Sequence, residues 1–197
     1  MKNYICLNGK KTELTKEQLK QLGISVKPLA TLSDDGKIVK VGDYEFIVLK
    51  NNGDTVELLL KDTLCNKPFG SNNNFAESDI RDYLDKFADK LAELVGEDNI
   101  VEHTVDLTAD DGLKCYGSCD CRVSLLTAQM YRENVYAIDK YKLDKWWWLS
   151  TAYSTPKHDD SCWVKCVSPY GCINFDGCGN YCGLRPFCIL KSNIFKS

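Results

Sequence analysis

Histidine and methionine are scarce in this chain, which has only two of each among its 197 residues. Cysteine catalysis needs a neighbouring base, most often a histidine. Neither His103 nor His158 stands at a diagnostic spacing from a cysteine, so the sequence favours a protein that is not an enzyme.

Long apolar runs are also lacking. No stretch approaches the roughly 18 apolar residues that cross a bilayer, and the N-terminus lacks the apolar core of a secretory signal peptide. We therefore expect a soluble chain that is made in the cytoplasm without a signal peptide and is not inserted into a membrane.

An excess of positive charge is absent as well. The 25 Lys and Arg residues are outnumbered by 28 Asp and Glu residues, which gives a net charge of -3 at pH 7. Because no positive field gathers a polyanion around such a chain, we expect no nucleic-acid partner.

Cysteine, in contrast, is abundant, with eleven residues, an odd number that cannot pair completely within one chain. A reducing cytosol also disfavours a full set of disulfides. The six cysteines from Cys162 to Cys188 lack the C-x-x-C spacing of structural zinc sites. Cys115, Cys119 and Cys121 could supply three zinc ligands, but a surface loop with incidental thiols is the simpler interpretation, and we expect neither a metal nor a cofactor.

Composition shifts divide the chain into two parts. Residues 1–32 read as an N-terminal helical arm, with Thr15 as the N-cap of a short helix and Gly23 as its end. Pro28 and the polar run Ser33–Gly36 separate this arm from a main domain over residues 33–197.

Hydrophobic periodicity predicts the elements of the main domain. Alternation predicts a hairpin around Asn51–Asp54, and a helical period predicts that one face of a long helix covers a sheet. The expected strands cover residues 37–41, 44–49, 55–60, 99–107 and 122–126, the expected helices cover 78–95 and 128–133, and residues 108–121 are expected to form a loop. The sequence thus predicts an α+β fold of mixed or antiparallel sheets with two main helices and a loop-rich C-terminal third.

Two conspicuous segments bracket this last third. We assign Trp147, Trp148, Gly183, Arg185 and Pro186 to the scaffold, with Arg185 buried and hydrogen-bonded and Gly183 allowing a backbone angle closed to other residues. The segment between them is rich in Tyr, Ser, Asn, Asp, Gly and Cys, which is typical of a binding surface.

Several short motifs occur in a family-specific order: Phe46–Leu49, Ile80–Leu84, Arg122–Thr127, Trp147–Leu149 and Gly183–Pro186. In this order they resemble the C-type-lectin-fold variable proteins that diversity-generating retroelements target, especially in phages and prophages of Firmicutes. The resemblance covers roughly residues 37–190. It implies a C-type lectin-like fold with a variable region at about residues 150–185.

The resemblance also implies how the variable region changes. Miscopied template adenines turn asparagine codons into codons for many residues, but never for Lys, Glu, Gln, Met or Trp. None of these five types occurs from Cys166 to Leu184. Cysteine is accessible by this route, so several cysteines become sampled surface residues, whereas Trp163 and Lys165 are fixed scaffold positions.

From the residues and the resemblance together we expect a non-enzymatic, receptor-binding or adhesin-like protein whose ligand is a protein or a cell-surface glycan. Its binding should not need calcium, and the N-terminal arm should serve oligomerisation or attachment to a phage tail, on a virion or a cell surface. The expected contact residues are Tyr153, His158, Asp160, Tyr170, Cys172, Phe175, Asp176, Asn180, Tyr181 and Cys182.

Two alternatives remain open. One is an oxidase on the related formylglycine-generating-enzyme fold, where a cysteine pair and a metal carry out the chemistry. The other is a structural component of a phage tail.

Overall fold

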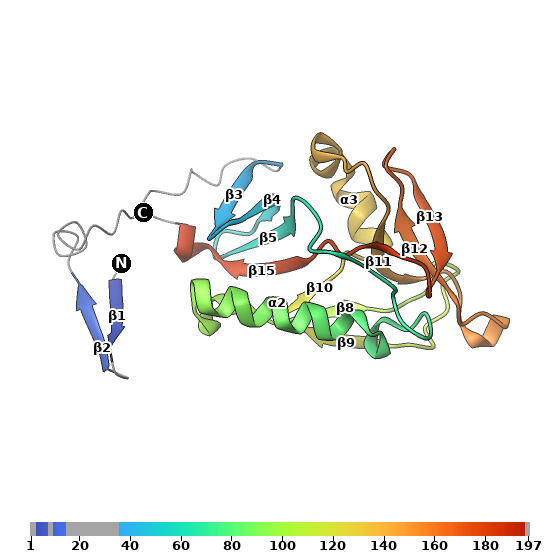
Figure 1. Cartoon of the computed structure of the whole chain (residues 1–197), viewed down its shortest axis with the longest axis horizontal. Coiled ribbons are helices and arrows are strands. Elements are labelled where there is room, and N and C mark those ends of the chain that lie inside the picture. The colour runs from blue at the N-terminus through green and yellow to red at the C-terminus, as the bar shows by residue number, and fades with distance from the viewer. Residues whose placement is uncertain (1–2, 8–9, 15–35, 196–197) are drawn as a thin grey trace.

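A computed structural model describes residues 3–7, 10–14 and 36–195 of the chain (Figure 1). These residues confirm the predicted α+β class, because most of the regular structure is β-sheet and two longer helices accompany it. Among the described residues, no helix is both long enough and apolar enough to cross a bilayer.

The element bounds from residue 36 onward are as follows. The helices are α2 (Ile80–Val95) and α3 (Ala128–Ile138), and the short 3-10 turns are η1 (Phe75–Glu77), η2 (Glu97–Asn99), η3 (Asp139–Tyr141), η4 (Pro156–His158) and η5 (Ser192–Phe195). The strands are β3 (Ile38–Val41), β4 (Tyr44–Asn51), β5 (Thr55–Leu60), β6 (Asn66–Lys67), β7 (Ile100–Val101), β8 (His103–Asp106), β9 (Ser118–Cys121), β10 (Val123–Ser124), β11 (Trp147–Ala152), β12 (Trp163–Val167), β13 (Ile173–Gly177), β14 (Cys182–Gly183) and β15 (Phe187–Lys191).

The N-terminal part contains a hairpin that the sequence analysis does not anticipate. Strands β1 (Asn3–Leu7) and β2 (Lys10–Leu14) pair antiparallel, with Asn3 opposite Leu14. The helix expected from Thr15 to Gly23 lies outside the described residues.

A six-stranded sheet forms the first layer of the main domain. Its order is β10-β15-β5-β4-β3, and β7 pairs with β15 beside this path. The β4–β5 hairpin turns at the predicted place, where Gly53 adopts φ +87°, a conformation that glycine takes without strain. Strand β15 pairs antiparallel with β5, which belongs to the first third of the chain (Figure 1). The first and last strands of the main domain are thus joined in one sheet.

Both faces of this sheet are buried. Successive side chains of a strand point to opposite faces. Phe46 of β4 therefore packs in the same cluster as Phe87 of α2, whereas its neighbour Ile47 packs in the cluster of Tyr131 from α3. The long helix thus covers one face of the sheet, as its apolar period predicts, and α3 covers the other.

Strand β11 is the centre of a second, five-stranded sheet with the order β13-β12-β11-β14-β6. All six residues of β11 are buried. Trp148 packs in the cluster of α2 and Trp147 in the cluster of α3, while Trp146 before the strand is 41% exposed. Both strand indoles therefore lie inside the molecule, on opposite faces of β11.

Arg185 connects the two sheets and is 1% exposed. Its Nε donates to the Leu60 carbonyl oxygen at 2.8 Å, and its Nη2 donates to the carbonyl oxygens of Lys61 at 2.9 Å and Tyr141 at 3.2 Å. The guanidinium carbon lies 5.0 Å from the Trp147 ring centroid. The predicted buried and hydrogen-bonded arginine is confirmed.

Gly183 is required for a reason other than the predicted backbone angle. Its φ lies outside the left-handed region, and a Cβ there would collide with the Thr63 side chain and approach the Trp146 carbonyl oxygen to 3.3 Å. Close packing against the segments just before β6 and β11 therefore excludes a side chain at this position.

The predicted boundaries are wrong in three places. The strand expected over 99–107 is divided into β7 and β8, which belong to different sheets. The end of the expected 108–121 loop is strand β9, which pairs with β8. Helix α3 continues past Glu133 to Ile138, because Ala137 and Ile138 still find buried positions against the sheet.

The buried and exposed tryptophans give a matched pair for a stability measurement. Replacing Trp148 by Ala should lower the free energy of unfolding by about 3–5 kcal/mol, because it leaves a large cavity and frees the Lys67 carbonyl oxygen that the indole Nε1 contacts at 2.9 Å. Replacing Trp146 by Ala should cost less than about 1 kcal/mol. Urea denaturation of both variants measures this, and equal losses would contradict the assignment of Trp148 to the core.

Candidate functional site

Strands β12 and β13 form the antiparallel hairpin that carries much of the predicted contact segment. Lys165 of β12 stands directly opposite Phe175 of β13. Because alternate side chains share a face, Trp163 and Lys165 lie on the same side of the sheet as Phe175. Tyr153 joins them from the residue after β11, where its backbone amide donates to the Trp163 carbonyl oxygen at 2.8 Å.

Three aromatic rings gather on this face, and we call Tyr153, Trp163 and Phe175 the aromatic platform. The Phe175 ring centroid lies 4.7 Å from that of Tyr153 and 5.5 Å from that of Trp163. The three side chains are 41%, 45% and 43% exposed in chain order. Contiguous exposed rings are typical of a binding surface, because aromatic side chains bury a large area at a small cost in conformational entropy.

A buried lysine lies beneath the platform. Lys165 is 7% exposed, and its Nζ lies 5.4 Å from the Tyr153 ring centroid and 5.8 Å from that of Phe175, both within cation–π range. The ammonium group also forms an ion pair of 3.0 Å with Asp110 Oδ2. The buried charge is therefore compensated, as burial of an ammonium group requires.

Asp110 connects this lysine to helix α3. Its Oδ1 accepts a hydrogen bond from Arg132 at 2.9 Å. Burial alone would raise the pKa of the Asp110 carboxyl, but the hydrogen bonds from Arg132 and Lys165 lower the pKa below its ordinary value. The carboxylate thus stays charged at neutral pH and fastens the loop between β8 and β9 to the underside of the platform.

A serine and a histidine of the loop between β11 and β12 lie beside an aspartate of the loop between β8 and β9. Ser154 Oγ donates to Asp111 Oδ2 at 2.5 Å, and His158 Nδ1 lies 3.0 Å from the same oxygen. In a hydrolytic triad the histidine stands between the serine and the carboxylate. Here the carboxylate stands in the middle, so the arrangement holds the loop in place and does not prepare a nucleophile.

The structure brings two of the predicted contact residues, Tyr153 and Phe175, into the platform. It adds Trp163, which the sequence reasoning assigns to the scaffold but which is half-exposed here. His158 is exposed in the adjacent loop. Asp160 is half-buried, and its Oδ1 accepts from the backbone amides of Cys162 and Trp163, so Asp160 orients the loop that leads into the platform.

Other predicted contact residues lie elsewhere. Tyr170 and Cys172 are exposed at the turn between β12 and β13, at the other end of the hairpin from Trp163. Asp176 points to the opposite face of β13 from Phe175, and its Oδ1 accepts a hydrogen bond from Asn180 at 2.6 Å. The predicted residues therefore do not form one continuous surface.

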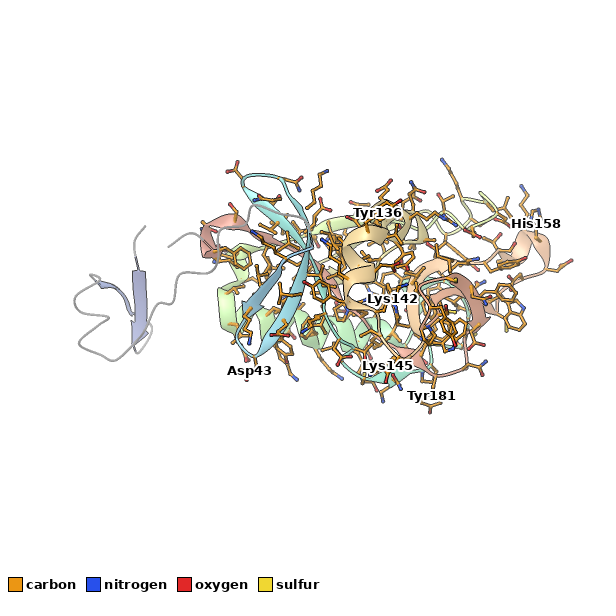
Figure 2. All side chains as sticks on the ribbon, turned by 90° about the horizontal axis from the view of Figure 1, so that it is seen from above. Asp43, Tyr136, Lys142, Lys145, His158 and Tyr181 are labelled. Atoms are coloured by element: carbon orange, nitrogen blue, oxygen red, sulfur yellow. The ribbon has the colours of Figure 1, made fainter. Side chains whose placement is uncertain are left out.

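Tyr181 is 71% exposed, in the loop between β13 and β14. Figure 2 shows its side chain well apart from His158, which lies at the far end of the molecule. The prediction that Cys182 contacts a ligand is wrong, because this residue is 2% exposed and packs in the core. Its thiol is hydrogen-bonded with that of Cys166. This contact, together with the smaller effect of burial, raises the pKa of Cys182 well above the ordinary value.

The cysteine-rich segment is less superficial than its composition suggests. Cys162 and Cys172 are exposed, but the other four cysteines of the segment are buried: Cys166, Cys178, Cys182 and Cys188. The expectation of sampled surface thiols is therefore wrong for Cys166, Cys178 and Cys182, whereas Cys188 lies outside the expected variable region. Burial raises the pKa of Cys188 to about 12, so this thiol stays protonated at neutral pH.

The three thiols considered as zinc ligands do not converge on one point. Cys115 Sγ accepts a hydrogen bond from Thr155 at 3.4 Å, whereas Cys119 and Cys121 contact each other. Among the side chains that the structure describes, no three His, Cys, Asp or Glu residues gather in the geometry of a metal site.

A hollow of about 860 Å³ lies between α2, the β3–β4 hairpin, the end of β5 and η3. None of the ten predicted contact residues lines this hollow. Two of its lysines, Lys40 and Lys61, are paired with Glu45. It is an open and charged groove, separate from the aromatic platform.

Comparison with protein-family models, with curated proteins and with solved structures found no match to this chain.

The charge beneath the platform can be tested by replacing Asp110 with Asn, which leaves Lys165 buried without its counter-ion. We expect the free energy of unfolding at pH 7 to fall by at least about 2 kcal/mol. Asp89→Asn, which removes an exposed partner of Arg122, should cost no more than about 1 kcal/mol and is the control.

The same comparison has a pH signature. The pKa of Asp110 in the folded chain lies below the unfolded value of about 3.9. The charged carboxylate therefore stabilises the folded chain fully above about pH 4, and this stabilisation is lost as the pH falls through the folded pKa. The difference in the free energy of unfolding between the wild-type chain and Asp110→Asn should therefore shrink below about pH 4. A difference that stays constant into acid would contradict the ion pair.

Proposed function

We propose that this chain is a non-enzymatic ligand-binding protein that uses the aromatic platform to bind a protein or a cell-surface glycan. The observation that carries the proposal is the half-exposure of three contacting rings, Tyr153, Trp163 and Phe175, on one face of a hairpin. Such rings in a monomer leave a preformed apolar surface for a partner to cover.

The surroundings of the platform favour binding over catalysis. The lysine beneath it is engaged by Asp110, and the nearby Ser154 and His158 are both engaged by Asp111. Polar groups that are already paired fix the rings in place without offering a base or a nucleophile to a substrate.

We also propose that the α+β arrangement is a C-type lectin-like fold and that residues of about 150–185 are its variable region. The order of the short motifs supports this, as does the lack of Lys, Glu, Gln, Met and Trp from Cys166 to Leu184. Exposure of Tyr170, Asn174 and Tyr181 on or beside the β12–β13 hairpin also fits replaceable positions. The N-terminal part would then serve attachment or oligomerisation, on a virion or at a cell surface.

Binding is tested with two probes, an array of cell-surface glycans and a displayed library of folded protein domains. We expect the purified chain to select members of one probe in the presence of EDTA, because the platform needs no calcium. The double variant Trp163→Ala, Phe175→Ala should bind the selected members at least about tenfold more weakly, since central aromatic contacts commonly contribute 2 kcal/mol or more.

The matched control is Tyr136→Ala, which removes an aromatic side chain that is 89% exposed on α3 and not part of the platform. It should leave the affinity unchanged. Selective binding that the double variant retains would contradict the platform, and a chain that selects nothing from either probe, or that carries stoichiometric copper or zinc, would contradict the proposed function.

The proposal that a retroelement diversifies residues 150–185 is tested by sequencing the neighbouring DNA. We expect a reverse transcriptase gene and a near-copy of codons 150–185 that differs at adenines. If both are missing, the diversification proposal is wrong, while the platform can still be a fixed binding surface.

A further inference from the structure

Strand β9 carries two cysteines on one face, outside the platform. Cys119 and Cys121 are two residues apart, so both side chains point to the same side of the extended strand. Their Sγ atoms lie 3.7 Å apart. The two thiols differ in accessibility, because Cys119 is partly exposed whereas Cys121 is 2% exposed.

An arginine from helix α2 reaches this pair. Arg81 Nη1 lies 2.5 Å from Cys121 Sγ and 3.6 Å from Cys119 Sγ. The guanidinium group is positioned by the Phe75 ring, whose centroid lies 5.4 Å from its central carbon. A guanidinium next to a thiol stabilises the thiolate, which is the nucleophilic form of cysteine.

Other titratable groups lie near the pair. Asp120 stands between the cysteines on β9 but points to the opposite face of the strand, where it accepts a hydrogen bond from Thr104. Asp85 lies near Arg81 on α2, and His103 of β8, whose pKa is lowered by burial, stands opposite Cys121. The hydrogen bond with Cys121, opposed by burial and assisted by Arg81, lowers the pKa of Cys119 to about 7, whereas the same contact raises that of Cys121. The pair therefore holds one thiolate and one thiol near neutral pH.

We propose that Cys119 and Cys121 form a hydroperoxide-reactive dithiol that closes reversibly to an intrastrand disulfide. Cys119 is the attacking residue, Cys121 is the resolving residue, and Arg81 is a positioning residue that holds the negative charge. The reactant is a hydroperoxide, either hydrogen peroxide or an organic peroxide. This site is independent of the proposed binding function.

The reaction has two balanced steps. The Cys119 thiolate attacks one peroxide oxygen, an S–O bond forms and the O–O bond breaks, and the departing oxygen takes a proton from water to leave as water or an alcohol. The Cys121 thiol then attacks the sulfenic sulfur, so that an S–S bond forms and the S–O bond breaks. The released hydroxyl group combines with the thiol proton and leaves as water. Two thiols are oxidised and one peroxide is reduced.

The strand can accommodate this closure. Residues i and i+2 of a strand are about 6.6 Å apart at their Cα atoms, which lies at the upper end of the range that a disulfide spans. Within the part of the chain that the structure describes, β9 pairs with β8 only. Because its other edge is not paired, β9 is able to contract locally, and the strain of the closed form favours its reduction back to the dithiol.

The experiment treats the full reduced chain with hydrogen peroxide, blocks the remaining thiols and maps the peptides by mass spectrometry. We expect a disulfide between Cys119 and Cys121 that dithiothreitol reverses. In the variant Cys121→Ser the resolving thiol is missing, so dimedone should trap a sulfenic acid on Cys119. The exposed Cys172 serves as the internal reference for accessibility alone.

The role of Arg81 is measured by the pH dependence of dimedone trapping in the Cys121→Ser background. Trapping should rise with pH as the Cys119 thiol ionises, and Arg81→Gln should slow it at pH 7, because the guanidinium is one of the groups that lower the pKa of Cys119. A rise of about one unit in this pKa corresponds to about fivefold slower trapping. Arg122→Gln is the control, because Arg122 binds Asp89 and Glu97. Circular dichroism of each variant checks that it is folded.

Three results would overturn the proposal. Peptide mapping could find no bond between Cys119 and Cys121. Cys172 could react with peroxide as fast as Cys119. A folded Arg81→Gln chain could react as the wild-type chain does.

Discussion

A buried guanidinium holds the two sheets of this molecule together. Arg185 donates to carbonyl oxygens at the end of β5 and after α3, and it stacks on Trp147 of β11. Burial lowers its pKa to about 10, so the group remains charged at neutral pH. Without it, three carbonyl oxygens would lose a charged donor in a region with little water. The position of β11, and of everything built on β11, depends on this contact.

The candidate binding surface is supported by β11 only indirectly, through two further strands. Strand β11 is buried on both faces and supports β12, which in turn supports β13. The rings of Tyr153, Trp163 and Phe175 therefore project from a backbone whose position is set elsewhere. The ion pair of Lys165 and Asp110 fastens the irregular loop after β8 to the same place. The reactive dithiol lies on β9, where the helix α2 and not the platform contacts it.

Local patterns predicted much of the fold. The alternation of apolar residues predicts the β4–β5 hairpin, and the apolar period predicts helix α2. Burial of Arg185 is predicted as well, and Trp147 and Trp148, which are assigned to the scaffold, are both buried. Tertiary pairings could not be predicted, because no local signal divides residues 99–107 between two sheets or brings Asp110 to Lys165. The same limit explains Cys182, whose polar neighbours in the sequence suggest a surface although its β14 position is internal. Trp163 was missed as a surface residue because exposure of a strand residue depends on what packs against that face.

If the scaffold is stable independently of its surface residues, exposed positions should be replaceable whereas buried ones should not. Resistance to proteolysis is compared for two libraries, one that randomises Tyr170, Asn174 and Tyr181 together and one that randomises Val164 and Cys166. All three positions of the first library are exposed, and both of the second are buried. We expect most members of the first library to keep their free energy of unfolding within about 0.5 kcal/mol per substitution, and most members of the second to be degraded. Degradation throughout the first library would show that the stability of the scaffold depends on these surface residues.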